Sequence, residues 1–171
     1  MILTFFIRLI QMLALVALQV LVLNHVQLWG YGTPLICIAL LLYMPMGTSR
    51  ISTLLWAFTM GLVVDIFSNT PGISSGALTL TAMIQPSLLE LMAPRDSAEN
   101  ILTTYQSMGR WNHVRYIMIL LFIHHLTYFM LEAFSIFNIR QTLLYMSASW
   151  VMSLLVILLL EGFRGKEKQT Y

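Results

Sequence analysis

Among the ionisable side chains that lie within or at the ends of long apolar segments of this sequence, where a charge is costly, five are candidates for a function. They are Asp65, His124, His125, Glu132 and Arg140. Carboxylates, imidazoles and a guanidinium in such surroundings can transfer protons, bind metal ions, form ion pairs or contact a partner protein. The choice among these chemistries depends on how the apolar segments position the five side chains.

His124 and His125 are adjacent, near the middle of one apolar segment. Neighbouring residues of an α-helix point about 100° apart, so the two imidazoles cannot face the same partner. A metal site would need further ligands at the same depth, and the other long apolar segments offer none, so we predict no metal. Hydrogen bonding between helices is favoured over proton transfer or catalysis. The same role is expected of three glutamines, Gln11, Gln19 and Gln85.

Asp65 and Glu132 end apolar segments, and Arg140 begins one. An acid at a helix carboxyl terminus and a base at an amino terminus each oppose the helix macrodipole by about 0.3–1 kcal/mol. Pairing among the three would offset this penalty. We expect Glu132 and Arg140 to extend into the headgroup layer as ordinary polar ends of spans. Asp65 could be a polar end of the same kind, or the centre of an outward-facing rim that recognises a partner.

The composition is that of a membrane protein. Of the 171 residues 58% are hydrophobic and only 9% are charged, whereas soluble domains carry roughly 25% charged residues. The formal net charge of +2 is too small to indicate nucleic-acid binding. The single cysteine excludes a disulfide within the chain. The sequence has no phosphate-binding glycine loop, H-E-x-x-H or G-x-S-x-G motif, so we predict a non-enzymatic protein without a cofactor.

The apolar runs predict an all-α membrane protein of one domain, residues 1–171, with six transmembrane helices. About 20 helical residues cross the ~30 Å hydrocarbon layer. The second span is short and begins at Pro34, and Ser74 or Ser75 is expected to cap the fourth. Residues 94–113 are rich in charged side chains, and the apolar side chains among them recur at helical spacing. This pattern predicts a short amphipathic helix on the membrane surface between spans four and five. The six expected spans are residues 3–23, 34–46, 51–67, 77–93, 114–134 and 139–160.

The distribution of basic residues predicts the orientation. With six spans and a cytoplasmic amino terminus, Arg140 is the only Lys or Arg on the outer side. The inner side then holds the other eight, Arg8, Arg50, Arg95, Arg110, Arg115, Arg164, Lys166 and Lys168. Basic residues concentrate on the cytoplasmic side of membrane proteins. We therefore predict that both termini are cytoplasmic.

The connection between the third and fourth spans carries a distinctive pattern. An apolar segment with a Gly four residues before an Asp is followed by Ser-Asn-Thr-Pro-Gly and a second apolar segment. The motif residues are Gly61, Asp65, Asn69, Pro71, Gly72 and Gly76. The stretch resembles the third and fourth transmembrane segments of the MreD family of rod shape-determining proteins. The hydropathy pattern extends this resemblance over nearly the whole chain.

The resemblance favours the functional role of Asp65, and it implies a non-catalytic scaffold of the cell-wall elongation machinery in the bacterial cytoplasmic membrane. It implies MreC as the partner and, through MreC, the actin-like MreB, the RodA glycosyltransferase and a penicillin-binding transpeptidase. It also implies a fold similar to the six-helix substrate-binding subunits of energy-coupling-factor vitamin transporters. Contacts with membrane lipids are expected, and contacts with nucleic acid are not.

Two other functions remain open at this point. One is a small-molecule carrier of the vitamin-transporter class, which needs a concave pocket of aromatic and polar groups beneath its outer loops. His25, Trp29, Tyr31 and Asp65 could line such a pocket. The other is an intramembrane enzyme that uses the adjacent histidines of the fifth span.

Overall fold

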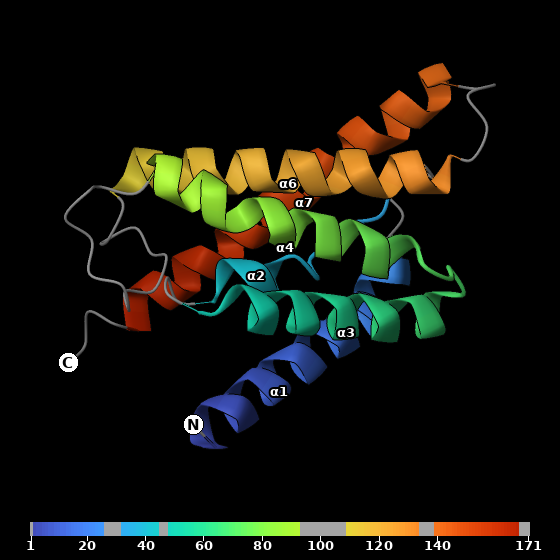
Figure 1. Cartoon of the computed structure of the whole chain (residues 1–171). Helices are drawn as coiled ribbons and strands as arrows, with labels where there is room; N and C mark the ends of the chain where they lie inside the picture. Colours follow the sequence, from blue (N-terminus) through green and yellow to red (C-terminus); the bar gives the residue numbers. More distant parts are fainter. Residues whose placement is uncertain (1, 26–31, 45–47, 93–108, 134–138, 168–171) are drawn as a thin grey trace.

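The computed structural model describes residues 2–25, 32–44, 48–92, 109–133 and 139–167, and these form a bundle of helices (Figure 1). The first helix continues beyond its α-helical part as one π-helical turn, Leu18–Val22, and one 3-10 turn, Leu23–His25. The α-helices are α1 (Ile2–Ala17), α2 (Ala39–Leu42), α3 (Arg50–Ser68), α4 (Ile73–Met92), α6 (Arg110–Glu132) and α7 (Ile139–Glu167).

Four helices are long and apolar enough to cross a membrane. The qualifying stretches are Phe5–Val22, Arg50–Ser68, Trp111–Glu132 and Ile139–Gly162. The all-helical class predicted from the sequence is therefore confirmed over the described residues, and the four apolar helices support a membrane protein, whereas six spans are not confirmed. Helix α4 has 20 residues, but serines, threonines, a glutamine and a glutamate lower its hydropathy, and it is not among the four.

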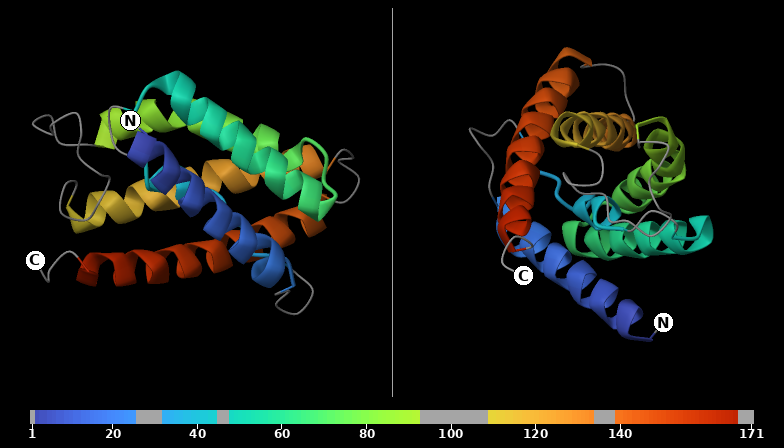
Figure 2. Two further views of the ribbon diagram at one scale, coloured as in Figure 1. Left: turned by 90° about the horizontal axis from the view of Figure 1, so that it is seen from below. Right: turned by 90° about the vertical axis from the view of Figure 1, so that its left-hand side faces the viewer.

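The segment expected to form the second span, residues 34–46, is not one long helix. Within its described part, only Ala39–Leu42 forms an α-helix, and the preceding residues 32–38 do not. Every residue from Pro34 to Leu42 is buried. Figure 2 shows this segment in the middle of the bundle, enclosed by the longer helices. It forms the centre of the hydrophobic core and has no face for lipid.

Hydrogen bonds show the direction in which this inner segment runs. Near the start of α1, Arg8 donates to Thr48 Oγ1 at 3.2 Å, just before α3 begins. Beyond the end of α1, Asn24 Nδ2 donates to Ser68 Oγ at 2.8 Å, where α3 ends. The described residues 32–44 therefore lie in the chain between Asn24, beside the last turn of α3, and Thr48, just before its first turn. The chain passes through the bundle a second time here, largely without helix.

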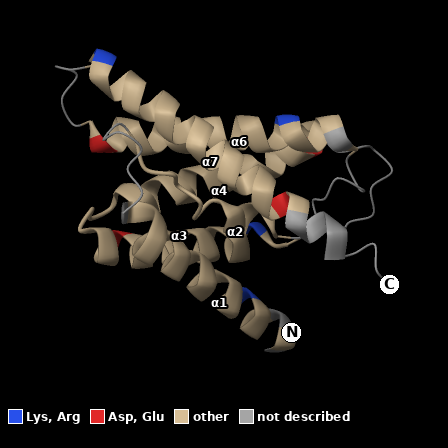
Figure 3. Cartoon of the chain, turned by 180° about the vertical axis from the view of Figure 1, so that it is seen from behind, with Lys and Arg blue, Asp and Glu red and all other residues tan. Residues whose placement is uncertain are grey.

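The two ends of the bundle differ in what they present. We call the end with the α3–α4 turn the hairpin end, and the end where α1 begins and α7 finishes the terminal end. Figure 3 shows the basic residues mainly at the terminal end. There Arg50 lies 3.9 Å from Glu90, both well exposed. Arg140 lies at the hairpin end, at the start of α7.

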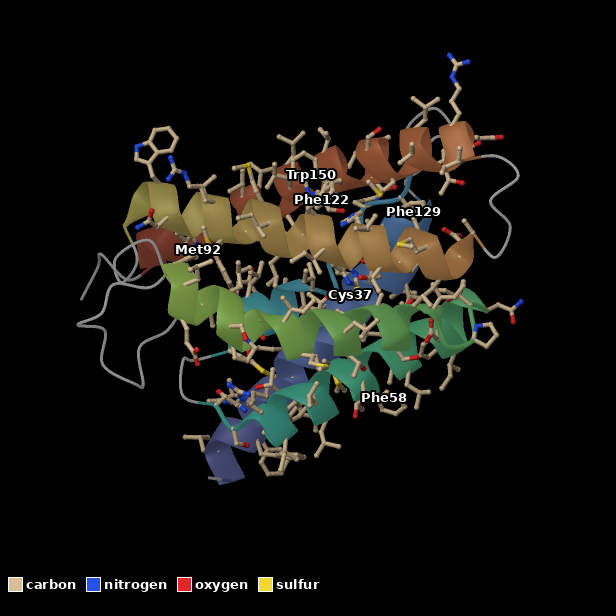
Figure 4. The ribbon with its side chains drawn as sticks, turned by 45° about the horizontal axis from the view of Figure 1, so that its top comes forward. Cys37, Phe58, Met92, Phe122, Phe129 and Trp150 are labelled. Carbon is tan, nitrogen blue, oxygen red and sulfur yellow. The ribbon has the colours of Figure 1, made fainter. Side chains whose placement is uncertain are left out.

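The outer surfaces of the helices are apolar, as lipid-facing surfaces require. Phe58 of α3 and Phe122 of α6 are exposed on these surfaces, whereas Cys37 of the inner segment lies inside the bundle (Figure 4). The predicted amphipathic helix, residues 94–113, falls largely outside the described residues. For residues 110–113 the prediction is wrong, because these residues already belong to α6, which begins at Arg110. His113 is consequently buried in the bundle and does not lie on a membrane surface.

Candidate functional site

Asp65 is buried at the hairpin end, with 4% of its surface exposed, and its carboxylate accepts four hydrogen bonds. Oδ1 accepts from the Ser74 amide at 2.8 Å and from Thr70 Oγ1 at 3.0 Å. Oδ2 accepts from the Ser75 amide at 2.9 Å and from the Ser75 hydroxyl at 2.8 Å. Both amides belong to the first turn of α4, where amide groups have no partner within the helix. Asp65 of α3 thus caps the next helix.

This geometry corrects three expectations from the sequence. Helix α4 begins at Ile73, four residues before the expected start, and the capping group comes from Asp65, not from a serine of α4 itself. The unfavourable interaction with a helix macrodipole that was expected for Asp65 is also replaced by a favourable one. Its carboxylate lies against the amino terminus of α4, where a negative charge is favourable.

Gly61 lets the two helices of the hairpin touch. A Cβ atom at this position would lie 2.3 Å from Ser75 Cα and 2.7 Å from the Ser74 carbonyl oxygen. No side chain fits there without moving the backbone of α4. Residues four apart share one face of a helix, so Gly61 and Asp65 both face the start of α4. The close approach at the glycine brings the carboxylate within reach of the α4 amides.

The turn itself uses the remaining motif residues. Asn69 ends α3 in the left-handed conformation with φ of 56°, and its amide donates to the Asp65 carbonyl. Ile73 N donates to Thr70 O at 3.2 Å, and Gly72 has φ of 86°. Pro71 followed by a glycine of positive φ is the sequence of a type II turn. Asn69, Pro71 and Gly72 are exposed at the tip.

Three further predicted residues take no part in the hydrogen bonds of Asp65. Gly76 faces α6, where an added Cβ would lie 3.1 Å from Leu131 Cδ1. Glu132 ends α6 and Arg140 begins α7, and both are exposed. Within the described part of the chain, no ion pair joins either of them to Asp65. The mutual pairing considered from the sequence is not what satisfies the Asp65 carboxylate.

The two adjacent histidines face different neighbours at the centre of the bundle. The Thr81 hydroxyl donates to the Ala77 carbonyl at 2.7 Å, so it accepts from His124 Nδ1–H at 3.5 Å. The Cys37 thiol then donates to His124 Nε2, with sulfur and nitrogen 3.8 Å apart. These contacts join α6 to α4 and to the inner segment. Both histidine side chains are completely buried.

His125 points toward α7. Its Nδ1–H donates to the Leu121 carbonyl at 2.8 Å, and its Nε2 lies 3.0 Å from Ser153 Oγ. The same hydroxyl accepts from Leu35 N at 2.7 Å. The imidazoles therefore connect helices and hold the inner segment. Among the described residues, no cluster of three or more His, Cys, Asp or Glu could hold a metal ion.

Two of the glutamines expected to bond between helices both reach the inner segment: Gln85 bonds to helix α2, as expected, whereas Gln19 bonds to the non-helical part, which the sequence did not disclose. Gln19 donates to the Pro34 carbonyl at 3.0 Å and accepts from Ile36 N at 2.8 Å. Gln85 of α4 donates to the Leu41 carbonyl at 2.8 Å. Irregular backbone at membrane depth is tolerated only where its polar groups find partners in protein or water. These side chains supply such partners to the inner segment.

A buried acid–base pair at the terminal end was also missed. His113 Nε2 lies 3.4 Å from Glu161 Oε2, and both side chains are almost completely buried. The pair joins the first turn of α6 to the end of the apolar run of α7. Antiparallel neighbours keep the sum of their residue numbers roughly constant. The sequence signal was that His113 stands at the start of one apolar run and Glu161 at the end of the next, positions that meet when the two helices run antiparallel.

The exposed α3–α4 turn, with Asp65 capping α4, therefore lies at one end of a bundle whose buried polar side chains are hydrogen-bonded to one another and to the backbone. Comparison of the chain with protein-family models, with curated proteins and with solved structures found no match. Of the residues expected to line a carrier pocket, Trp29 and Tyr31 lie outside the described residues, as does the side chain of His25. Asp65 has both carboxylate oxygens engaged by the hairpin.

Proposed function

We propose that the chain is a non-catalytic scaffold of the bacterial cytoplasmic membrane, similar to MreD proteins, that maintains cell shape by binding other proteins of the cell-wall elongation machinery. MreC is the proposed direct partner, and MreB, RodA and a penicillin-binding transpeptidase are reached through it. One observation carries the proposal. The residues of the motif that resembles MreD, from Gly61 to Gly72, form one continuous hairpin in which Asp65 caps α4.

The hairpin has the properties of a recognition surface. Its interior is fixed by four hydrogen bonds to one buried carboxylate, so the exposed tip is held in one conformation. Preorganised surfaces bind with a smaller loss of conformational entropy. Beside the tip, Phe67 is 64% exposed and offers an aromatic contact. Aromatic residues are enriched among those that dominate binding energy at interfaces.

The proposed topology has six crossings, and the inner segment provides the second. The terminal end faces the cytoplasm in this proposal, because the described basic residues lie mainly there (Figure 3). The hairpin then faces outward. Cysteines introduced at exposed Asn69 and Asn112 test this orientation, because Cys37 is buried and unreactive. An impermeant maleimide should label the Asn69 position in intact spheroplasts and spare Asn112, and the reverse pattern excludes the proposed orientation.

The carrier alternative receives less support. A carrier needs space for its substrate beneath the outer loops, and the inner segment, with Pro34 to Leu42 buried throughout, occupies the middle of the bundle. An intramembrane enzyme also receives less support, because both histidines are completely buried and bonded within the bundle. The scaffold proposal requires neither a pocket nor an accessible imidazole.

The proposal is tested in the bacterium that produces the chain. Depletion should convert rods to rounded cells, and the intact protein should co-purify with an MreC-type partner in mild detergent. Phe67→Ala should reduce recovery of the partner without lowering the amount of protein in the membrane. Phe58→Ala is the matched control, since Phe58 is 48% exposed on the same helix away from the turn. Normal rods after depletion, or equal partner recovery with Phe67→Ala and Phe58→Ala, would exclude this function for the hairpin.

A further inference from the structure

A polar side chain on α1 faces outward from the bundle at membrane depth. Gln11 is exposed, and no hydrogen bond joins it to another described residue. It lies six residues into the apolar stretch Phe5–Val22, or about 9 Å along the helix. Gln19, in contrast, is completely buried and bonded to the inner segment. An amide without a partner is costly in hydrocarbon, so the exposed position of Gln11 indicates a partner from another molecule.

Gln11 belongs to a seam with the spacing of a helix–helix interface. The residues Ile7, Gln11, Ala14, Leu18 and Leu21 follow one another at intervals of four, three, four and three. This alternation is the spacing of left-handed helix pairs, in soluble coiled coils and in membranes. Four of the five are exposed, Leu18 is half-buried, and Leu21 is 71% exposed. Ala14, beside Gln11, is small enough for a second helix to approach closely.

The position of α1 leaves this seam accessible. Figure 2 shows α1 on the outside of the bundle, crossing beneath α3. Its contacts with the rest of the chain come from other sides of the helix, where Met12, Leu15 and Val16 are buried in the core. Phe5 lies against Trp56 of α3, with ring centroids 5.4 Å apart.

We propose that α1 pairs with α1 of a second copy of this chain, with the two Gln11 amides hydrogen-bonded to each other across a two-fold axis along the membrane normal. Two copies inserted in the same orientation place Gln11 at the same depth. An amide carries both donors and an acceptor, so it is complementary to itself in a symmetric pair, unlike a charged side chain. A polar residue in such a seam fixes register, as a buried Asn does in soluble coiled coils. The interface lies on a face of α1 that the α3–α4 turn does not include, and it does not depend on the proposed function.

Disulfide cross-linking in native membranes tests the seam. Cys37 is the only native cysteine and is 1% exposed, so single cysteines can be added to the full-length chain. Ala14→Cys should give a cross-linked dimer of the chain on mild oxidation. Leu13→Cys is the matched control, since Leu13 is exposed on a different side of α1, and it should cross-link far less. Equal cross-linking at both positions, or a product of Ala14→Cys that contains only a different protein, overturns the pairing with a second copy.

The role of the amide is tested by energy transfer between labelled copies in liposomes. Gln11→Leu should weaken dimerisation about tenfold, equivalent to about 1.4 kcal/mol, which lies within the range of hydrogen bonds between membrane helices. Gln11→Asn should retain part of the affinity, because the amide survives on a shorter side chain. The thermal stability of the monomer should be unchanged in both variants. A monomeric wild-type chain, or a Gln11→Leu dimer as tight as the wild type, overturns the proposal.

Discussion

Replacement of Asp65 by alanine tests the capping interaction directly. The substitution removes the acceptors of two α4 amides, those of Ser74 and Ser75, and of two hydroxyl groups. The hydroxyls can rotate toward other acceptors, but the amides are fixed by the helix. The free energy of unfolding should therefore fall mainly through the two amides.

The magnitude follows from the bonds that are lost. A buried amide left without an acceptor costs about 1–3 kcal/mol, and loss of a helix N-cap costs about 0.5–2 kcal/mol. Relief from burying a charge offsets part of this loss. We expect Asp65→Ala to lower the free energy of unfolding by about 2–4 kcal/mol. Arg140→Ala should change it by less than about 0.5 kcal/mol, as for other exposed positions.

Two conservative variants separate the cap from a role of the charge alone. Asp65→Asn keeps one acceptor oxygen in place but turns an amide donor toward the other α4 amide, so it should recover roughly half of the lost stability. Asp65→Glu keeps the charge and adds a methylene beside the close contact at Gly61, where the helix backbones leave no room. The Asp65→Asn variant should therefore be more stable than the Asp65→Glu variant.

Reversible unfolding in mixed micelles, followed by tryptophan fluorescence, measures these differences. The reasoning is refuted if Asp65→Ala stays within about 0.5 kcal/mol of the wild type, the range of neutral surface substitutions. A loss with Arg140→Ala equal to that with Asp65→Ala, without further loss in the double variant, would show instead that the two residues form an internal pair. If Asp65→Glu is more stable than Asp65→Asn, the negative charge contributes more to stability than the fit of the side chain beside Gly61.

Other substitutions test the contacts of the interior by the same unfolding measurement. Gly61→Ala should destabilise by about 1–3 kcal/mol through overpacking, whereas Gly162→Ala, which meets open space, should be neutral or stabilising; equal effects would contradict the close approach of the helices. Gln19→Leu leaves a carbonyl and an amide of the inner segment unpaired and should cost about 2–4 kcal/mol, while Gln11→Leu should leave the monomer unaffected; similar losses would argue against the inner segment as described. His125→Gln should preserve abundance, since one hydrogen bond between membrane helices averages ~0.6 kcal/mol; a stable but inactive His125→Gln protein would favour proton transfer.

Hydropathy predicted the long helices because an apolar run of about 20 residues has few other solutions in a membrane. Residues 51–67 and 114–134 correspond closely to α3 (Arg50–Ser68) and α6 (Arg110–Glu132). The helix ends were harder to predict. Helix α4 starts before its expected first residue because its cap is supplied from α3, and α6 starts inside a stretch whose charges suggested a surface helix. End positions depend on tertiary hydrogen bonds that hydropathy does not contain.

The prominence of Asp65 was visible in the sequence, but its chemistry was not. A lone carboxylate at the end of an apolar segment suggests an ion pair or a site that recognises a partner, and both interpretations look for the group that satisfies the charge outside the hairpin. In the structure, amides and hydroxyls satisfy the carboxylate. The spacing contained the necessary signal. Gly61 precedes Asp65 by one helical turn, and the Pro-Gly turn folds the first turn of α4 back onto that face.

The inner segment shows most clearly what hydropathy alone cannot determine. Residues 34–46 are as apolar as a span. Their described part from Pro34 to Leu42 is buried on all sides by protein, and such a segment avoids water as strictly as one surrounded by lipid. Its conformation is set elsewhere, by the polar groups that reach its backbone from Gln19, Gln85 and Ser153. A chain that places such donors and acceptors on surrounding helices can carry an irregular segment through the membrane. The buried glutamines and serine are therefore the part of the sequence that distinguishes this bundle from six plain helices.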